Sequence, residues 1–515
     1  MAQVRSRSFG SQGLVAWHVS HTCRAGTLAL ALIAGTVVQV MSVSAEAQTV
    51  NPSAPKRPTR GLPDPDKPLA PVQPPATPGA PAAPGSTPAT PATPGMPAAT
   101  PGSTETKKEP VWGPIVTRER ERDLLFQVRI HLNSDNNSDT VTYTDPFSGK
   151  TVTMPNPKPF EFLTMGVVWP VLRESASAVT FRSDIKGVLK INDQIADDTP
   201  TMLPNYPGGI MLARFDAGDN QKPIYCRQVD LEMEIPVRCY RTVYDEAAAL
   251  KMGWPSRWPE QATSIMAPQL FLEQGIDTDG KVKPFETTIL DATIERWLKQ
   301  ERIGKPKDVP PALLAKIITG KVWRDVALNN DQFLTFKRTG EVSGFNTKPA
   351  EWTLRDGRGT QLDLAITLAT ALRRTGLPAR LVIGHDNSGG DGKFLKGDNK
   401  SARPTAWVEF CLYDENANTV NWVPIDIARL KKSSSRPSDI ARPWKYFGTH
   451  DEMDRIVPFA FHLHPPTDVV AYGSPGIWGW FVTPAPPVQA EQSLSFMSTL
   501  PSTRGGEPKR EPGEK

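Results

Sequence analysis

Few side chains in this sequence could support nucleophilic catalysis. That chemistry needs a thiol or hydroxyl, a base to remove its proton, and a group that orients the base. Cys411 lies four residues after Trp407 in a strand-like run, so we expect a buried and inert thiol. His385 ends another strand-like run, where a position facing a cleft competes with a partly exposed structural one. The local sequence therefore offers no adjacent nucleophile and base.

Composition and motifs exclude several classes of function. The formal net charge is only +4, and acidic and basic residues are interspersed, so no nucleic-acid partner is predicted. Asp135-x-Asn137-x-Asp139 resembles the start of a calcium loop, but Thr140 stands where the loop needs glycine, so we predict a turn. The sequence has no metal-ligand cluster, phosphate-binding loop or Gly-x-Ser-x-Gly elbow. We therefore predict neither a metal nor a cofactor.

Helices followed by strands surround the polar residues of the central region. Apolar residues recur at helical spacing over 285–299 and 311–329, and again over 361–375, where Gly376 and Pro378 mark the end. Three β-rich runs come next, at 381–383, 407–412 and 420–425. The order predicts an α+β domain with an antiparallel sheet over residues 285–483.

Four short motifs in this region are informative together. They are Gly359-Thr-Gln-Leu-Asp-Leu-Ala365, Arg373-Arg-Thr-Gly-Leu-Pro-Ala-Arg380, Ala406-Trp-Val-Glu409 and Trp422-Val-Pro-Ile-Asp426. Their order and spacing resemble the core of the transglutaminase-like superfamily, whose fold is related to that of papain. The resemblance is sharpest over residues 352–426.

The resemblance implies a catalytic Cys, His and Asp, and two of these positions are changed. Gln361 stands where the family has its cysteine, Thr405 stands where it has histidine, and only Asp426 matches. A carboxamide has no useful nucleophilic lone pair, and a threonine hydroxyl has a high pKa and no adjacent base. We expect Asp426 to bond Thr405 or Gln361 in a polar remnant of the site, and Asp363, His385 and Trp407 to lie at the cleft.

Two functions follow from the resemblance. The first is a catalytically degenerate domain that binds a protein or a cell-envelope polymer. The second is a transglutaminase-like amidase, peptidase or acyltransferase with an altered site, for instance one using His385 with Thr405 and Asp426. A cleft with a perturbed ionisable group would favour the second. A purely structural wall-spanning protein is a third reading.

Residues 111–284 carry mainly strand signals. Leu125 to Leu132 alternates apolar and polar residues, and two Thr-rich runs flank a turn at Pro146 to Gly149. We predict a β-rich, sandwich-like domain. Cys226 and Cys239 fall in one strand-like run from Tyr225 to Tyr244, and we expect both, like Cys411, to be small buried residues.

The two ends of the chain are predicted to lie outside the folded part. Residues 1–47 combine early arginines, an apolar run and Ala45-Glu-Ala47, which is typical of a signal peptide, with an uncleaved membrane anchor as the alternative. Either would export the chain to the periplasm, cell envelope or medium, with membrane contact only through this segment. Residues 48–110 are predicted to form a Pro/Ala/Thr-rich disordered linker, because residues 51–110 contain 18 prolines. Residues 484–515 are predicted to form a disordered tail.

Overall fold

The computed structural model describes residues 110–133, 140–144, 151–155, 160–277, 281–337, 340–387, 403–436, 439–463, 476–484 and 491–500. All of them belong to one compact unit, residues 101–515. The predicted leader, nearly all of the linker and the calcium-like stretch at 135–139 lie outside the described residues. Among the helices of the described part, none is long and apolar enough to cross a membrane.

A five-stranded sheet forms the centre of the predicted α+β region. Its strands, in spatial order, are β1 (Val111–Trp112), β22 (Thr419–Ile425), β21 (Arg403–Asp414), β20 (Ala379–Asp386) and β23 (Ile456–Ala460). β20, β21 and β22 pair antiparallel, as predicted from the β-rich runs. β1 pairs parallel with β22, although it comes from the predicted N-terminal domain.

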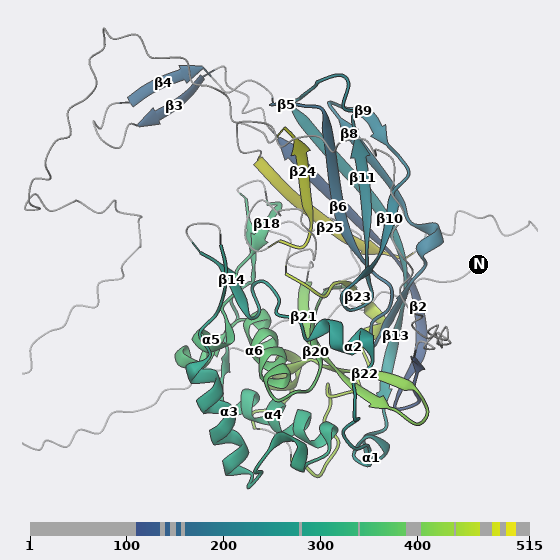
Figure 1. The fold of residues 1–515 in the computed structure, drawn as a ribbon, viewed down its shortest axis with the longest axis vertical. Helices are drawn as coiled ribbons and strands as arrows, with labels where there is room; N and C mark the ends of the chain where they lie inside the picture. Colours follow the sequence, from purple (N-terminus) through teal and green to yellow (C-terminus); the bar gives the residue numbers. More distant parts are fainter. Residues whose placement is uncertain are drawn as a thin grey trace, which may run out of the picture. The chain divides into compact units, whose positions relative to one another are not determined.

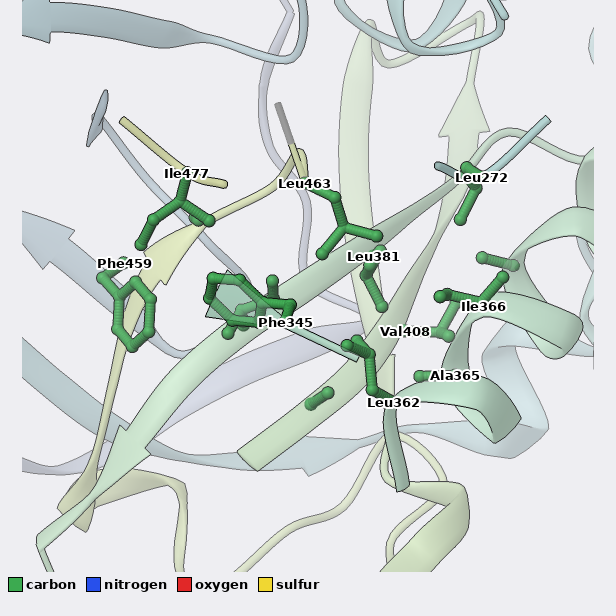
Figure 2. Close-up of a cluster of buried hydrophobic side chains, with 14 of the residues drawn as sticks. Leu272, Phe345, Leu362, Ala365, Ile366, Leu381, Val408, Phe459, Leu463 and Ile477 are labelled. Carbon is green, nitrogen blue, oxygen red and sulfur yellow. The ribbon is translucent and has the colours of Figure 1, made fainter. Parts of the chain in front are cut away.

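Helices lie beside this sheet (Figure 1). They are α3 (Thr288–Gln300), α4 (Pro311–Asp325), α5 (Ala350–Asp356), α6 (Gln361–Arg374) and α7 (Ile427–Ser433). α6 is buried continuously from Leu362 to Arg373, because α4, α5 and α7 surround it and β20 and β21 cover its remaining side. Figure 2 shows Leu362 and Ile366 of α6 beside Val408 of β21. A helix whose side chains are buried on every face, polar ones such as Thr367 and Thr370 included, needs such an enclosure.

The C-terminus of α6 has the chemistry that the sequence predicts. Gly376 adopts a left-handed φ of 85°, and Leu377 N–H donates to Leu372 C=O at 3.1 Å, which closes the C-terminus. In the last turn, the buried Arg373 pairs with Glu273 at 2.5 Å. The pair joins α6 to the segment that precedes the predicted domain boundary at 284/285.

Two further sheets, one of eight strands and one of four, account for the β-rich region (Figure 1). The first runs in the order β17 (Leu334–Phe336), β18 (Val342–Phe345), β25 (Glu491–Thr499), β2 (Val116–Asn133), β13 (Gln228–Tyr244), β8 (Lys186–Ile191) and β9 (Gln194–Asp197), with β7 (Ala178–Thr180) also on β13. The second has the order β10 (Thr201–Tyr206), β11 (Ile210–Ala217), β6 (Thr164–Leu172) and β24 (Gly479–Thr483). Gly187 of β8 faces Phe215 of β11, so the sheets pack face to face like a sandwich.

Strands from late in the chain complete both of these sheets. β24 pairs with β6, and β25 pairs with β2 along nine residues. The prediction of a disordered tail from 484 is therefore wrong for 491–499. Composition suggested disorder, but Leu494 and Phe496 alternate with serines and are buried, which is the pattern of a strand. The predicted boundaries at 284 and 483 do not separate independent sheets.

The remaining elements are short. They are the pairs β3 (Thr140–Thr144) with β4 (Thr151–Pro155), β5 (Phe160–Phe162) with β12 (Ile224–Cys226), β14 (Gln274–Ile276) with β15 (Val282–Pro284) and β16 (Ala327–Leu328) with β19 (Arg358–Gly359), and the helices α1 (Glu246–Ala249) and α2 (Glu260–Ile265). The predicted single run from Tyr225 to Tyr244 is divided at Arg227 into β12 and β13.

The three described cysteines are buried, as predicted. Burial raises the pKa of the Cys226 thiol to about 12 and raises the pKa values of Cys239 and Cys411 as well. Because the thiolate is the reactive form, all three are poor nucleophiles at neutral pH.

Candidate functional site

The N-terminus of α6 is fixed by a capping box. Thr360 Oγ1 accepts a hydrogen bond from Asp363 N–H at 3.2 Å, and Asp363 Oδ2 accepts one from Thr360 N–H at 2.8 Å. Asp363 Oδ1 accepts a third from Lys348 N–H at 2.8 Å, and the side chain is 2% exposed. Asp363 is therefore a buried cap rather than the cleft residue we predicted.

Gln361, the first residue of α6, contacts Thr405 of β21. Gln361 Nε2 donates to Thr405 Oγ1 at 2.7 Å and to the Ala406 carbonyl oxygen at 3.2 Å. The contact forms because the start of α6 lies over β21. Two residues 44 positions apart in the sequence, both predicted for the site, are thus brought together by a neutral hydrogen bond.

Asp426 is turned away from that pair. It caps α7, where its Oδ1 accepts a hydrogen bond from Arg429 N–H at 2.9 Å. Its Oδ2 lies 3.2 Å from Arg429 Nε and 3.5 Å from His450 Nε2, and it makes no aligned hydrogen bond. The expected bond from Asp426 to Thr405 or Gln361 is absent from the described structure, because the cap holds the carboxylate over α7.

His450 is a neighbour of Asp426 that the sequence did not indicate. Glu452 N–H donates to His450 Nδ1 at 3.3 Å, so the neutral ring carries its proton on Nε2, toward Asp426. The side chain is 1% exposed and stacks edge-on against Tyr446. Both ring nitrogens face protein groups, and His450 is therefore a partner of the buried acid rather than a base open to a ligand.

A cleft of about 570 Å³ opens beside Gln361 and Thr405. Three groups of residues line it: the segment Leu328, Asn329, Asn330, Asp331, Gln332 and Phe333; the sheet and helix residues Gln361, Asp386, Pro404 and Thr405; and Arg429, Lys432, Ser433, Tyr446 and Glu452. Amides, hydroxyls and charged groups dominate this lining, and it includes no cysteine or histidine among the described residues. Such a surface can hydrogen-bond to a polar ligand, but it offers no thiolate or imidazole.

Arg429 is the electrostatic centre of the cleft. Its Nη2 lies 2.6 Å from Asp386 Oδ2, its Nε faces Asp426, and its Nη1 contacts the Glu452 carboxylate. One guanidinium thus holds three carboxylates, two of which line the cleft. These acids are engaged as ion-pair partners, so none of them is poised as a base for Thr405.

Strand alternation explains where His385 lies. Asp386 and Thr405 both line the cleft, and in β20 the neighbouring His385 points to the opposite face of the strand. There its Nδ1 lies 2.8 Å from Ser498 Oγ, and its ring packs edge-on against Phe496. His385 is 4% exposed, and its side chain packs against β25. The prediction that it lies at the cleft is therefore wrong.

His385 should make the protein less stable in acid. Burial lowers its pKa to about 4, whereas an unfolded histidine titrates near pH 6.5. The unfolded chain therefore binds a proton that the folded one does not, so stability falls as the pH drops from about 6.5 toward about 4, by at most about 3 kcal/mol. Urea unfolding at both ends of this range should show a smaller loss for His385→Asn than for the wild type. Equal losses would contradict the assignment.

Trp407, which we also expected at the cleft, belongs to the core. It is fully buried, and its Nε1 donates to Glu409 Oε1 at 3.2 Å. Glu409 pairs with Arg380 through bonds of 2.6 and 2.9 Å from the guanidinium to Oε2. The Arg380 guanidinium lies 4.0 Å from the Trp422 ring and 3.9 Å from the Phe461 ring. Residues of three predicted motifs thus meet in a buried scaffold behind the site.

Sequence reasoning missed most of the cleft wall. The helix predicted over 311–329 ends at Asn329, whereas α4 ends at Asp325, and no role was predicted for the polar residues 330–332. A cluster of Asn and Asp residues at a helix end is a loop signal that could have identified it. Arg429 follows Asp426 by three residues, a spacing that places the two on one face of a helix.

Comparison with known proteins finds a matching family model and two solved structures of low similarity. Residues 326–427 match the model of the transglutaminase-like superfamily. A candidate cysteine protease from Cytophaga hutchinsonii is 13% identical, with a TM-score of 0.40 over 75% of this chain and 93% of that one. A candidate protease from Parabacteroides distasonis is 9% identical, with a TM-score of 0.18, and 59% of each chain is covered. No curated protein matches.

The matched residues include α5, α6 and β20 to β22, and they carry the four motifs and the Gln361–Thr405 contact. The chain therefore contains a domain of the transglutaminase-like superfamily, folded as an α+β unit beside a β-rich region.

Proposed function

We propose that this protein is exported and that its transglutaminase-like cleft binds a protein or a cell-envelope polymer without carrying out acyl transfer. The observation that carries the proposal is the hydrogen bond between Gln361 and Thr405. It occupies the positions at which the resemblance requires a thiol and an imidazole. Export rests on the signal-like sequence of residues 1–47.

The cleft supports binding in preference to chemistry. Thr405 Oγ1 already accepts a hydrogen bond from Gln361, and Asp386, a carboxylate in the cleft lining, is paired with Arg429. Asp386 and Glu452 could act as a base for that hydroxyl only after leaving their ion pairs with Arg429. The cleft nevertheless remains open, at about 570 Å³, which is within the size range of ligand sites.

Assays of ammonia release and amine incorporation test the prediction that the protein does not catalyse acyl transfer. We expect the purified full chain, incubated with a glutamine-containing protein and a primary amine, to give the rate of a protein-free blank. Reaction above the blank would overturn the proposal in favour of an amidase, peptidase or acyltransferase with an altered site. The assay would then be repeated with Thr405→Val to locate the reacting group.

Sedimentation with purified peptidoglycan sacculi, and retention on immobilised unfolded casein, test binding. Asn330 is exposed and lines the cleft, so Asn330→Trp should obstruct it and weaken binding by about tenfold or more. Ile195→Trp adds the same side chain at a position that is 66% exposed on β9 and outside the cleft, so it should bind like the wild type. Equal effects of the two variants would contradict a cleft-based interaction.

A further inference from the structure

A second, smaller pocket adjoins the cleft. Its volume is about 320 Å³. The wall contains two tryptophans, two serines and two basic residues, namely Trp323, Trp444, Ser433, Ser434, Arg436 and Lys445. Ser433, the last residue of α7, also lines the cleft. The pocket is at the small end of the size range of ligand sites, so it suits a single ring-sized group rather than a long segment.

The charge of this pocket comes from a basic segment of the chain. Residues 429–445 contain six basic residues and one acidic residue. Lys431 and Lys432 lie in the last turn of α7, where the helix dipole favours cations, so their charge has a structural explanation. Arg436 and Lys445 lie beyond the helix, are exposed, and have no carboxylate partner among the described residues. Because the described wall has no Asp or Glu, the pocket attracts an anion.

The serines of the wall present hydrogen-bond acceptors. Ser433 Oγ donates its hydrogen to the Leu430 carbonyl oxygen at 2.8 Å, and Ser434 Oγ donates to the Arg436 carbonyl oxygen at 2.6 Å. Because each hydroxyl hydrogen is already used, the oxygen can only accept a bond from a ligand. Ser433 is exposed, so its oxygen can be reached. A ligand with hydroxyl donors matches this part of the wall.

The tryptophans give the pocket a rigid apolar wall. Trp444 Nε1 donates to the Asp439 carbonyl oxygen at 2.9 Å, and its ring lies so close to α4 that a Cβ on Gly320 would be 3.0 Å from it. Trp323 is 8% exposed and Trp444 is 5% exposed, so most of each ring is fixed in the core and only the remainder borders the pocket. An apolar wall beside charged and hydroxyl groups suits a ring that has an apolar face and polar substituents.

We infer that this pocket binds a carboxylated sugar residue, such as a hexuronic acid unit of an acidic polysaccharide. The carboxylate pairs with Arg436 and Lys445, a sugar hydroxyl donates to Ser433, and the apolar face of the ring packs on the tryptophan wall. An acidic peptide would supply the carboxylate without a ring that carries hydroxyl donors. The site is additional to the cleft, and it does not rest on the proposed function.

Isothermal titration calorimetry of the full chain with trigalacturonate tests the inference. Fully methyl-esterified trigalacturonate is the matched ligand, because it keeps the rings and hydroxyls but has no charge. Triglutamate carries three side-chain carboxylates without the sugar rings. We expect trigalacturonate to bind about tenfold or more tightly than either control. Absence of trigalacturonate binding, or an equal affinity for either control, would overturn the inference.

Two basic residues of the same segment provide matched variants. Arg436→Gln should weaken trigalacturonate binding by about tenfold and reduce the preference for the acid over its ester. Arg442→Gln removes the same charge from an exposed residue that lines neither the pocket nor the cleft, so it should bind like the wild type. Equal effects of the two variants would reveal a diffuse charge effect and overturn the inference.

The cleft variant separates this inference from the proposed function. Asn330→Trp obstructs the cleft and should leave trigalacturonate binding unchanged. Binding that is lost in Asn330→Trp but kept in Arg436→Gln would place the sugar in the cleft and overturn the inference. Acyl transfer by the wild type would overturn the proposed function, and the preference for trigalacturonate over its ester would still support the pocket.

Discussion

Replacing Glu409 by alanine is expected to lower the free energy of unfolding by about 3–5 kcal/mol, the usual cost of removing one partner of a buried ion pair. The side chains of Arg380 and Glu409 are only 3% and 0% exposed. In Glu409→Ala the guanidinium would remain between the Trp422 and Phe461 rings without its counter-charge. Burial already lowers the pKa of Arg380, which shows how poorly its surroundings solvate the cation.

Glu409 also serves two neutral donors. Its Oε1 accepts hydrogen bonds from Ala176 N–H at 3.0 Å and from Trp407 Nε1 at 3.2 Å. Glu409→Gln can keep these acceptor contacts while removing the charge, so it should be less destabilising than Glu409→Ala. Urea unfolding of both variants separates the contribution of the charge from that of the hydrogen bonds.

A surface pair of the same kind supplies the control. Arg374 bonds Asp291 through two contacts of 2.7 and 2.8 Å, but the two side chains are 52% and 43% exposed. Arg374→Ala should therefore change the free energy of unfolding by no more than about 1 kcal/mol. Comparable losses in Arg374→Ala and Glu409→Ala would contradict the assignment of Glu409 to a buried scaffold.

The second large effect is a gain of activity in Gln361→Cys, Thr405→His. The cysteine would stand at the N-terminus of α6, where the helix dipole favours a thiolate, and the histidine would stand within contact of it. Ammonia release from glutamine-containing protein should then rise about 10²-fold above the wild type. Thr405→His alone should remain at the level of the wild type because it has no nucleophile.

The rate of the double variant should stay well below that of an enzyme with a complete triad. The reason is that Asp426 is engaged with Arg429 and His450 and cannot orient the new histidine. In subtilisin, losing the acid alone costs about 3 × 10⁴ of the roughly 2 × 10⁶ that the whole triad supplies, which leaves the factor of about 10² expected here. Silence in the double variant, with its fold confirmed by circular dichroism, would show that the cleft has lost the geometry as well as the groups.

Local rules in the sequence were sufficient for the elements that carry the motifs. The helical period over 361–375 and Gly376 at its end predict that helix, and the structure adds the capping box of Thr360 and Asp363 at its start. Apolar β-rich runs determine β20, β21 and β22. These features depend on residues within one or two turns of each other, so they can be read without knowing the tertiary fold.

The orientation of the site side chains, and the groups with which they pair, could be learned only from the tertiary structure. Whether His385 or Asp386 faces the cleft depends on which side of β20 is covered by β25, a strand that begins more than 100 residues later. The Arg429 cluster likewise joins Asp386 and Glu452, which no short motif connects. By itself, the sequence predicted α6 and the strands β20, β21 and β22, and it marked Gln361 and Thr405 as the residues at the positions where the resemblance implies cysteine and histidine. Packing between distant segments decided which side chains meet, because burial and charge pairing depend on neighbours in space rather than on neighbours along the chain.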